Sequence, residues 1–321
     1  MMFGNIAVLF NVLSIMALSG LLVILTLTAL IKLRWCELNQ YSILSRRGLL
    51  WLIALSPWLV SLLASTLAIL SGTQYALFPR SFDILHWHHA EEFMLNSWHG
   101  LSVVAAYGGV SILLLRKIYK LILNTRQINL LRGVAQPDDN GFYLLDTDAA
   151  TAFTAGYLKP RCFITSGLRN QLSDDEFEII QLHEKAHVRC SDPAKKWFFN
   201  LLTAFFPTEI SRKLNQSMSL TMEQCADLSI TRVISDKSLI AMTLLKVRRL
   251  SAAPIGNGLD NDLTCYYAYD QIEERIRYIL NGTPLKSFPF MFTCLAAVSM
   301  SLVCALSVDI VHHLIEYTLD H

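Results

Sequence analysis

Residues 173–187 read Ser-Asp-Asp-Glu-Phe-Glu-Ile-Ile-Gln-Leu-His-Glu-Lys-Ala-His. Ser173 and Glu176 have the spacing of a capping box, in which two side chains satisfy free backbone amides at the start of a helix. The acidic residues of this first turn also complement the positive end of the helix dipole. The stretch therefore predicts a helix that starts after Ser173 and runs to about Arg189.

Two histidines share one face of this predicted helix. His183 and His187 are four residues apart, so at 3.6 residues per turn both imidazoles can reach one metal ion. Zinc suits such a site because it accepts neutral nitrogen ligands. A His-Glu-x-x-His match is expected by chance only about 0.01 times in a chain of this composition, which favours a Zn²⁺ site over surface histidines.

A catalytic zinc ion normally takes three protein ligands, so a further residue is required. Glu223, on a predicted downstream helix, is the best candidate. Asp227 lies one turn further along and is placed to accept a hydrogen bond from the outer nitrogen of a ligating histidine, as carboxylates around metal sites commonly do. Glu184 is then expected to be the catalytic general base, which takes a proton from water and returns it to the leaving amine.

Three neighbouring residues allow other interpretations. Cys190 and Cys225 are alternative residues to bind or block the metal, although free cysteines are more often simple packing residues. Asp192 is followed by Pro193, and proline is favoured at the first position of a helix. We therefore interpret Asp192 as a helix cap and not as a ligand.

The composition of the whole chain indicates a membrane protein. Of 321 residues, 53% are hydrophobic and only 17% are charged, and the mean hydropathy is +0.39. Four stretches lack Asp, Glu, Lys and Arg over enough residues to cross about 30 Å of hydrocarbon. Buried helices of a soluble core are the weaker alternative, because four such runs leave little amphipathic surface to face water. The stretches are Met1–Ile31, Gly48–Pro79, Phe93–Leu115 and Ser287–Val308.

The expected fold class is an α-helical integral membrane protein with four transmembrane helices and an α+β domain between the third and fourth. Residues 1–123 form the membrane region, with helices at about 5–33, 49–71 and 94–120. Residues 124–286 form the metallopeptidase domain, and residues 287–321 form the fourth helix and a short external tail.

Basic residues predict the orientation, because they tend to stay on the cytoplasmic side of a membrane. They crowd the loop after the first helix and the segment after the third. The peptidase domain is therefore expected in the cytoplasm and both termini outside, in a multi-pass protein of the cell inner membrane. The residues concerned are Lys32, Arg34, Arg46 and Arg47, and Arg116, Lys117, Lys120 and Arg126.

Turn residues at 136–141 and short β-prone pieces at 142–145, 152–155 and 162–165 predict a small sheet. The apolar run 197–206 is too short to span a membrane, so it either lies in the membrane interface or is buried in the peptidase core. Further helices are expected at 215–234, 238–250 and 269–280.

The order of these motifs resembles the membrane metallopeptidases of the BlaR/MecR type, which are sensor-transducers with a gluzincin-like domain between their third and fourth membrane helices. The resemblance implies that His183, His187 and Glu223 bind zinc and that Glu184 is catalytic. It also implies that an extended substrate pairs with an edge strand made of Phe153, Thr154, Ala155 and Gly156. The motifs that carry it are Phe153–Arg161, Leu172–Glu176, His183–Arg189 with Asp192–Pro193, Glu223–Asp227 and Glu274–Ile276.

One departure from this family concerns the end of the chain. Only about a dozen residues follow the fourth predicted helix, so the penicillin-binding sensor domain of the family is not expected, and neither is direct β-lactam sensing. His86, His88 and His89 of the external loop are either a metal- or pH-responsive sensing element or an ordinary interfacial segment.

The sequence therefore predicts a zinc-dependent membrane endopeptidase in regulatory signal transduction. Its expected partners are membrane lipid and a protein or peptide substrate near the cytoplasmic membrane face, such as a repressor or the protein itself. A net charge of +1 gives no reason to expect direct binding of nucleic acid. The alternatives are a quality-control or processing peptidase like the HtpX and CAAX-protease group, and a catalytically silent membrane receptor or scaffold.

Overall fold

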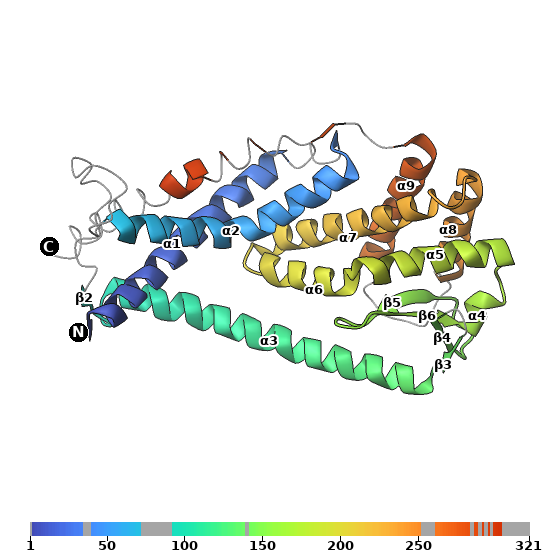
Figure 1. The fold of residues 1–321 in the computed structure, drawn as a ribbon, viewed down its shortest axis with the longest axis horizontal. Coiled ribbons are helices and arrows are strands. Elements are labelled where there is room, and N and C mark those ends of the chain that lie inside the picture. Colours follow the sequence, from blue (N-terminus) through green and yellow to red (C-terminus); the bar gives the residue numbers. More distant parts are fainter. Residues whose placement is uncertain are drawn as a thin grey trace.

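The computed structural model describes most of the chain and places it in an elongated molecule (Figure 1). The first two long helices lie toward one end, and a small sheet with the last helices lies toward the other. The third long helix runs along most of the length and ends beside the sheet. The described residues are 2–34, 40–71, 92–138, 141–251, 261–282, 286–287, 291, 295 and 298–303.

Three helices of the described part are long and apolar enough to cross a membrane. They are α1 (Asn5–Arg34), α2 (Ile43–Ser71) and α3 (Trp98–Val134), and their candidate spans are Asn5–Leu33, Ile43–Leu67 and Gly100–Val134. Two short strands, β1 (Met2–Phe3) and β2 (Glu92–Phe93), pair beside them. The fourth predicted span falls mostly outside the described residues, as do His86, His88 and His89.

The bounds of α2 and α3 differ from the predicted ones. Arg46 and Arg47, which we expected in a loop, belong to the first turns of α2. Helix α3 starts after Ser97, whose hydroxyl accepts a hydrogen bond from the amide of Gly100, and it continues well past residue 120. Its last part holds mostly leucine, isoleucine, asparagine and arginine, and it reaches a helix breaker only at Gly133, so nothing ends the helix where the apolar run ends.

A four-stranded sheet follows α3. Its order is β3-β4-β6-β5, with β4 and β6 parallel and the other pairs antiparallel. The three predicted β pieces are confirmed as strands, and a short β3 precedes them. Strand β5 lies at the edge of the sheet, as expected for the proposed substrate strand. The strands are β3 (Gln136–Pro137), β4 (Phe142–Leu145), β5 (Ala152–Ala155) and β6 (Arg161–Thr165).

The predicted capping box is present at the start of α5: the Ser173 hydroxyl accepts from the amide of Glu176, and the Glu176 carboxylate accepts from the amide of Ser173. Each later helix that the sequence predicted is also present, with shifted ends. The helices are α4 (Ser166–Arg169), α5 (Asp174–Cys190), α6 (Asp192–Thr203), α7 (Thr208–Ile230), α8 (Lys237–Ser251) and α9 (Asn261–Asn281).

The core joins the long N-terminal helices to the domain. Leu50 and Ile53 of α2 pack in one buried cluster with Phe199 of α6 and Met218 of α7. Helix α6 also packs on α2 through aromatic pairs, including Trp51 with Phe199 at 5.3 Å between ring centroids. The apolar run of α6 is therefore packed between α2 and α7, and its partner is a candidate membrane helix.

Candidate metal centre

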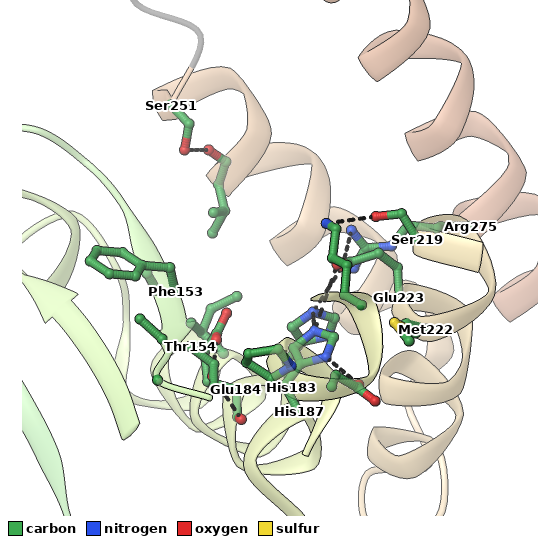
Figure 2. Close-up of a pocket in the computed structure, with 18 of the residues that line it drawn as sticks. Phe153, Thr154, His183, Glu184, His187, Ser219, Met222, Glu223, Ser251 and Arg275 are labelled. Atoms are coloured by element: carbon green, nitrogen blue, oxygen red, sulfur yellow. Dashed lines mark hydrogen bonds and ion pairs between the residues drawn. The ribbon is translucent and has the colours of Figure 1, made fainter. Parts of the chain in front are cut away.

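The structure brings three predicted site residues together. His183 and His187 are buried on one face of α5, and their Nε2 atoms lie 3.1 Å apart. Glu223 reaches them from α7, with Oε2 3.2 Å from His183 Nε2 and Oε1 3.7 Å from His187 Nε2 (Figure 2). Among the described residues, these three form a group that can hold a metal ion, with ligand atoms all within 4.8 Å of one another.

Each histidine meets a carboxylate at its outer nitrogen. His183 Nδ1 lies 3.1 Å from Asp227 Oδ1, within ion-pair distance but outside hydrogen-bond geometry. His187 Nδ1 lies 2.7 Å from Asp192 Oδ2. Carboxylates at these positions assign the ring proton to Nδ1 in the neutral imidazole, so each Nε2 is left as an acceptor.

The interpretation of Asp192 as a helix cap is wrong. Asp192 is the first residue of α6, and the flanking position belongs to Ser191. Ser191 has φ = 52°, and its amide bonds back to α5, so the chain turns sharply between the two helices. The left-handed backbone conformation of Ser191 places the Asp192 carboxylate beside His187. There it forms a hydrogen bond with Nδ1 of the ring instead of capping a free helix amide.

These contacts test whether a metal fits the donors. With both Nδ1 atoms protonated, two imidazole lone pairs and a carboxylate point at the same small volume. Three acceptors at such short distances repel one another unless a cation or a proton lies between them. Two neutral nitrogens and one carboxylate are also the ligand set of many catalytic zinc sites. The residues present therefore fit a zinc ion.

The charges around the site favour a positive ion among the donors. Burial lowers the pKa of His183, but its contacts with Asp227 and Glu223 outweigh burial and raise that pKa to about 10. Burial raises the pKa of Glu223, whereas His183 and Arg275 lower it more strongly, so the net pKa is well below its ordinary value. Both shifts have the same cause, which is the mutual attraction between the imidazole and the carboxylates around it.

Arg275 of α9 is a site residue whose role the sequence did not reveal. Its Nε and Nη2 each lie 2.8 Å from an oxygen of Asp227, and its Nη1 lies 3.1 Å from Glu223 Oε2. The pKa of Asp227 is lowered, because Arg275 and His183 outweigh the effect of burial. Arg275 therefore keeps both carboxylates ionised and fixes their orientation. The motif Glu274–Ile276 singled out this stretch through the family resemblance, but it gave Arg275 no role, since the partners of Arg275 lie about fifty positions earlier.

Glu184 lies beside the three donors without joining them. It is buried, and its Oε2 accepts a hydrogen bond of 2.7 Å from the Thr154 hydroxyl of β5. The edge strand thus orients this carboxylate directly. Gly156 ends the strand with φ = 110°, and a Cβ there would lie 2.7 Å from the carbonyl oxygen of Lys159, so the tight turn requires glycine.

A cavity of about 700 Å³ surrounds this group. Residues 152–157 line one wall, and α6, α7 and α8 supply the others, as Figure 2 shows for Phe153, Met222 and Ser251. An edge strand, a carboxylate base and a cluster of metal-binding donors therefore open into one space.

The two cysteines near the site stay outside the donor group. Cys190 and Cys225 are half-buried thiols, and neither belongs to the metal-binding group that the described residues form. This arrangement favours the interpretation of both as packing residues.

Asp192 gives a direct test of the outer carboxylates. We expect Asp192→Asn to weaken zinc binding about 10- to 100-fold, because an amide does not favour the same His187 tautomer and makes the ring a weaker donor. Competition with a chelator of known affinity measures the change. Asp174→Asn, an exposed change in the first turn of α5, is the control and should bind zinc as the native protein does. Native affinity in Asp192→Asn would contradict the role of this carboxylate.

Fold and site together define a class of protein: a helical protein with three candidate membrane spans and a peptidase-type domain that carries a His-His-Glu donor cluster. Residues 123–252, less than half of the chain, match Peptidase family M48. The matched segment contains both histidines, Glu184 and Glu223, and it supports metallopeptidase activity in general. Comparison with curated proteins finds no match.

Proposed function

We propose that this protein is a zinc-dependent membrane endopeptidase, in which His183, His187 and Glu223 bind the metal and Glu184 is the general base. One observation carries this proposal: the three acceptors of His183, His187 and Glu223 converge beside the buried carboxylate of Glu184. The cavity around them is large enough for a peptide segment. The match of residues 123–252 to a peptidase family supports the same conclusion.

The chemistry follows from the positions of these side chains. Zinc, when bound, supplies a Lewis acid that polarises a peptide carbonyl and makes water more acidic. Glu184 accepts a proton from the attacking water and returns it to the leaving amine. Thr154 holds the Glu184 carboxylate by its 2.7 Å hydrogen bond, and Asp192 and Asp227 orient the two imidazoles.

The edge strand supports a protein or peptide as the substrate. Strand β5 pairs only with β6 in the described sheet, so its other edge offers backbone groups to an extended chain. A polypeptide laid along residues 152–156 passes Thr154 and therefore Glu184. Candidate substrates are a cytoplasmic repressor and a segment of the protein itself, by the resemblance to the BlaR/MecR type.

The basic residues at the ends of the candidate spans support a cytoplasmic domain. Arg46 and Arg47 lie in the first turns of α2, and Arg116 and Lys117 follow the uncharged first half of α3. We propose a multi-pass protein of the inner membrane with a cytoplasmic peptidase domain, both termini external, and a role in regulatory signal transduction.

Zinc content tests the proposal. Protein purified in detergent without chelator and reconstituted with zinc should hold close to one zinc ion per chain by elemental analysis, and it should cleave a test protein such as β-casein in a zinc-dependent manner. The double variant Cys190→Ser with Cys225→Ser should hold the same amount. Folded protein that holds no zinc would remove the peptidase proposal and favour a receptor or scaffold.

A further inference from the structure

Arg46 is a cation that the proposed chemistry does not use. It lies in the first turns of α2, at the start of a candidate membrane span, yet only 5% of its surface is exposed. Its guanidinium extends away from its own helix into α7. Nε donates to Thr221 Oγ1 at 3.2 Å, and Nη2 donates to Gln224 Oε1. A membrane helix is thus tied by its side chain to the helix that bears Glu223.

The two acceptors flank the residue that the proposed function assigns as the third metal ligand. Thr221 and Gln224 are three positions apart and share one face of α7. Glu223, one position before Gln224, is turned by about 100° about the helix axis, so it points to the histidines while Arg46 holds the adjoining face. Both acceptors are buried, with Thr221 at 0% and Gln224 at 3% exposed.

Apolar packing continues the same contact along α2. Arg46, Leu50, Ile53 and Ala54 follow the spacing of one helix face, and the last three belong to the cluster that contains Met222 of α7. Met222 also lines the cavity and directly precedes Glu223. Helices α2 and α7 therefore meet along an apolar stripe. At one end of the stripe, Arg46 binds Thr221 and Gln224, and we call this contact the polar fork.

The polar fork fixes the register of this contact. A guanidinium presents its donors in a rigid plane, so it binds two acceptors at once only in one relative position of the helices. An apolar stripe alone allows small slides, but a slide that separates Arg46 from its acceptors leaves buried polar groups without partners. Metal ligands must keep their distances within about 0.2 Å, so a small shift of α7 is enough to change the site.

We propose that Arg46 is a positioning residue for the metal centre: it locks the register between α2 and α7 and so holds Glu223 at the distance from both histidines that metal binding requires. This inference rests on the proposed function. It makes α2 the route by which a change among the membrane helices reaches the site, through Glu223.

The test compares zinc affinity among variants of the full chain in detergent. Arg46→Met removes the donors and keeps an apolar side chain of similar length. It should raise the zinc dissociation constant about tenfold, which is the smallest effect typical of removing a residue that hydrogen-bonds directly to a metal ligand. Arg46→Lys keeps the charge but cannot bind both acceptors as a fork, so its effect should be smaller. Arg116→Gln removes an exposed cation of α3 and should leave the constant unchanged.

A double-mutant cycle separates positioning from general stability. Gln224→Met should also weaken zinc binding, and combination with Arg46→Met should add little further loss, because both changes break the same contact. Additive losses, or native zinc affinity in folded Arg46→Met with only a lower melting temperature, would overturn the inference. If Arg46→Met does not fold, zinc affinity in Arg46→Lys and Gln224→Met decides: a loss supports the inference and native affinity overturns it.

Failure of the proposed function gives a different result. If the native protein binds no zinc, both proposals are wrong. If the native protein binds zinc and the Arg46 variants bind it with the same affinity, only the role of Arg46 is wrong.

Discussion

Glu184→Gln is expected to lower the rate of peptide cleavage at least about 100-fold while the protein still holds zinc, because general acid-base catalysis contributes typically 10²- to 10⁴-fold. Glutamine keeps the size of the side chain, and its carbonyl can still accept from the Thr154 hydroxyl. It cannot take a proton from water. Rates on β-casein and zinc content by elemental analysis, both measured on the reconstituted protein, test the two halves of this expectation.

The matched control is Glu178→Gln, the same substitution at an exposed position of the same helix. It should change neither rate nor zinc content. Loss of zinc in Glu184→Gln would show that Glu184 helps to hold the metal, and an unchanged rate would show that another group takes the proton. Either result would contradict the division of roles between Glu184 and the three donors.

The parts of the site that the sequence predicted depend on local rules. The capping box of Ser173 and Glu176 sets the start of α5, and the helical period then places His183 and His187 on one face. Asp227 follows Glu223 by one turn of α7, so the two carboxylates also share a face. Short-range spacing was sufficient for these residues, and only the approach of α7 to α5 depended on the tertiary fold.

The parts that the sequence did not predict depend on contacts between distant residues or on an unusual backbone angle. The position of Asp192 follows from the left-handed conformation of Ser191, and serine gives no signal of that conformation. Arg275 meets Asp227 across 48 positions, and Arg46 meets Gln224 across 178. The sequence also placed Arg46 in a loop. Positive charges near a membrane helix predict the orientation of that helix in the membrane, but they do not predict which of these side chains is buried.

Glu223→Gln is expected to weaken zinc binding by more than about 100-fold, since loss of a direct ligand must exceed the 10- to 100-fold cost of losing an outer-shell partner. An uncharged amide also leaves less negative charge to balance the ion. The fold should persist, because Arg275 keeps its two bonds to Asp227. Zinc at about 1,000 times its dissociation constant stabilises the native protein by about 4 kcal/mol, so thermal unfolding with and without zinc measures the loss.

In native protein, zinc should raise the melting temperature, whereas in Glu223→Gln the same concentration should raise it far less. Glu209→Gln, in the first turn of α7, removes an exposed carboxylate that pairs with Lys213 and should keep the full response to zinc. A full response in Glu223→Gln would mean that the histidines bind zinc without this residue. The third ligand would then have to come from another carboxylate of the cavity, and Asp192 and Glu184 are the nearest to the histidines in sequence.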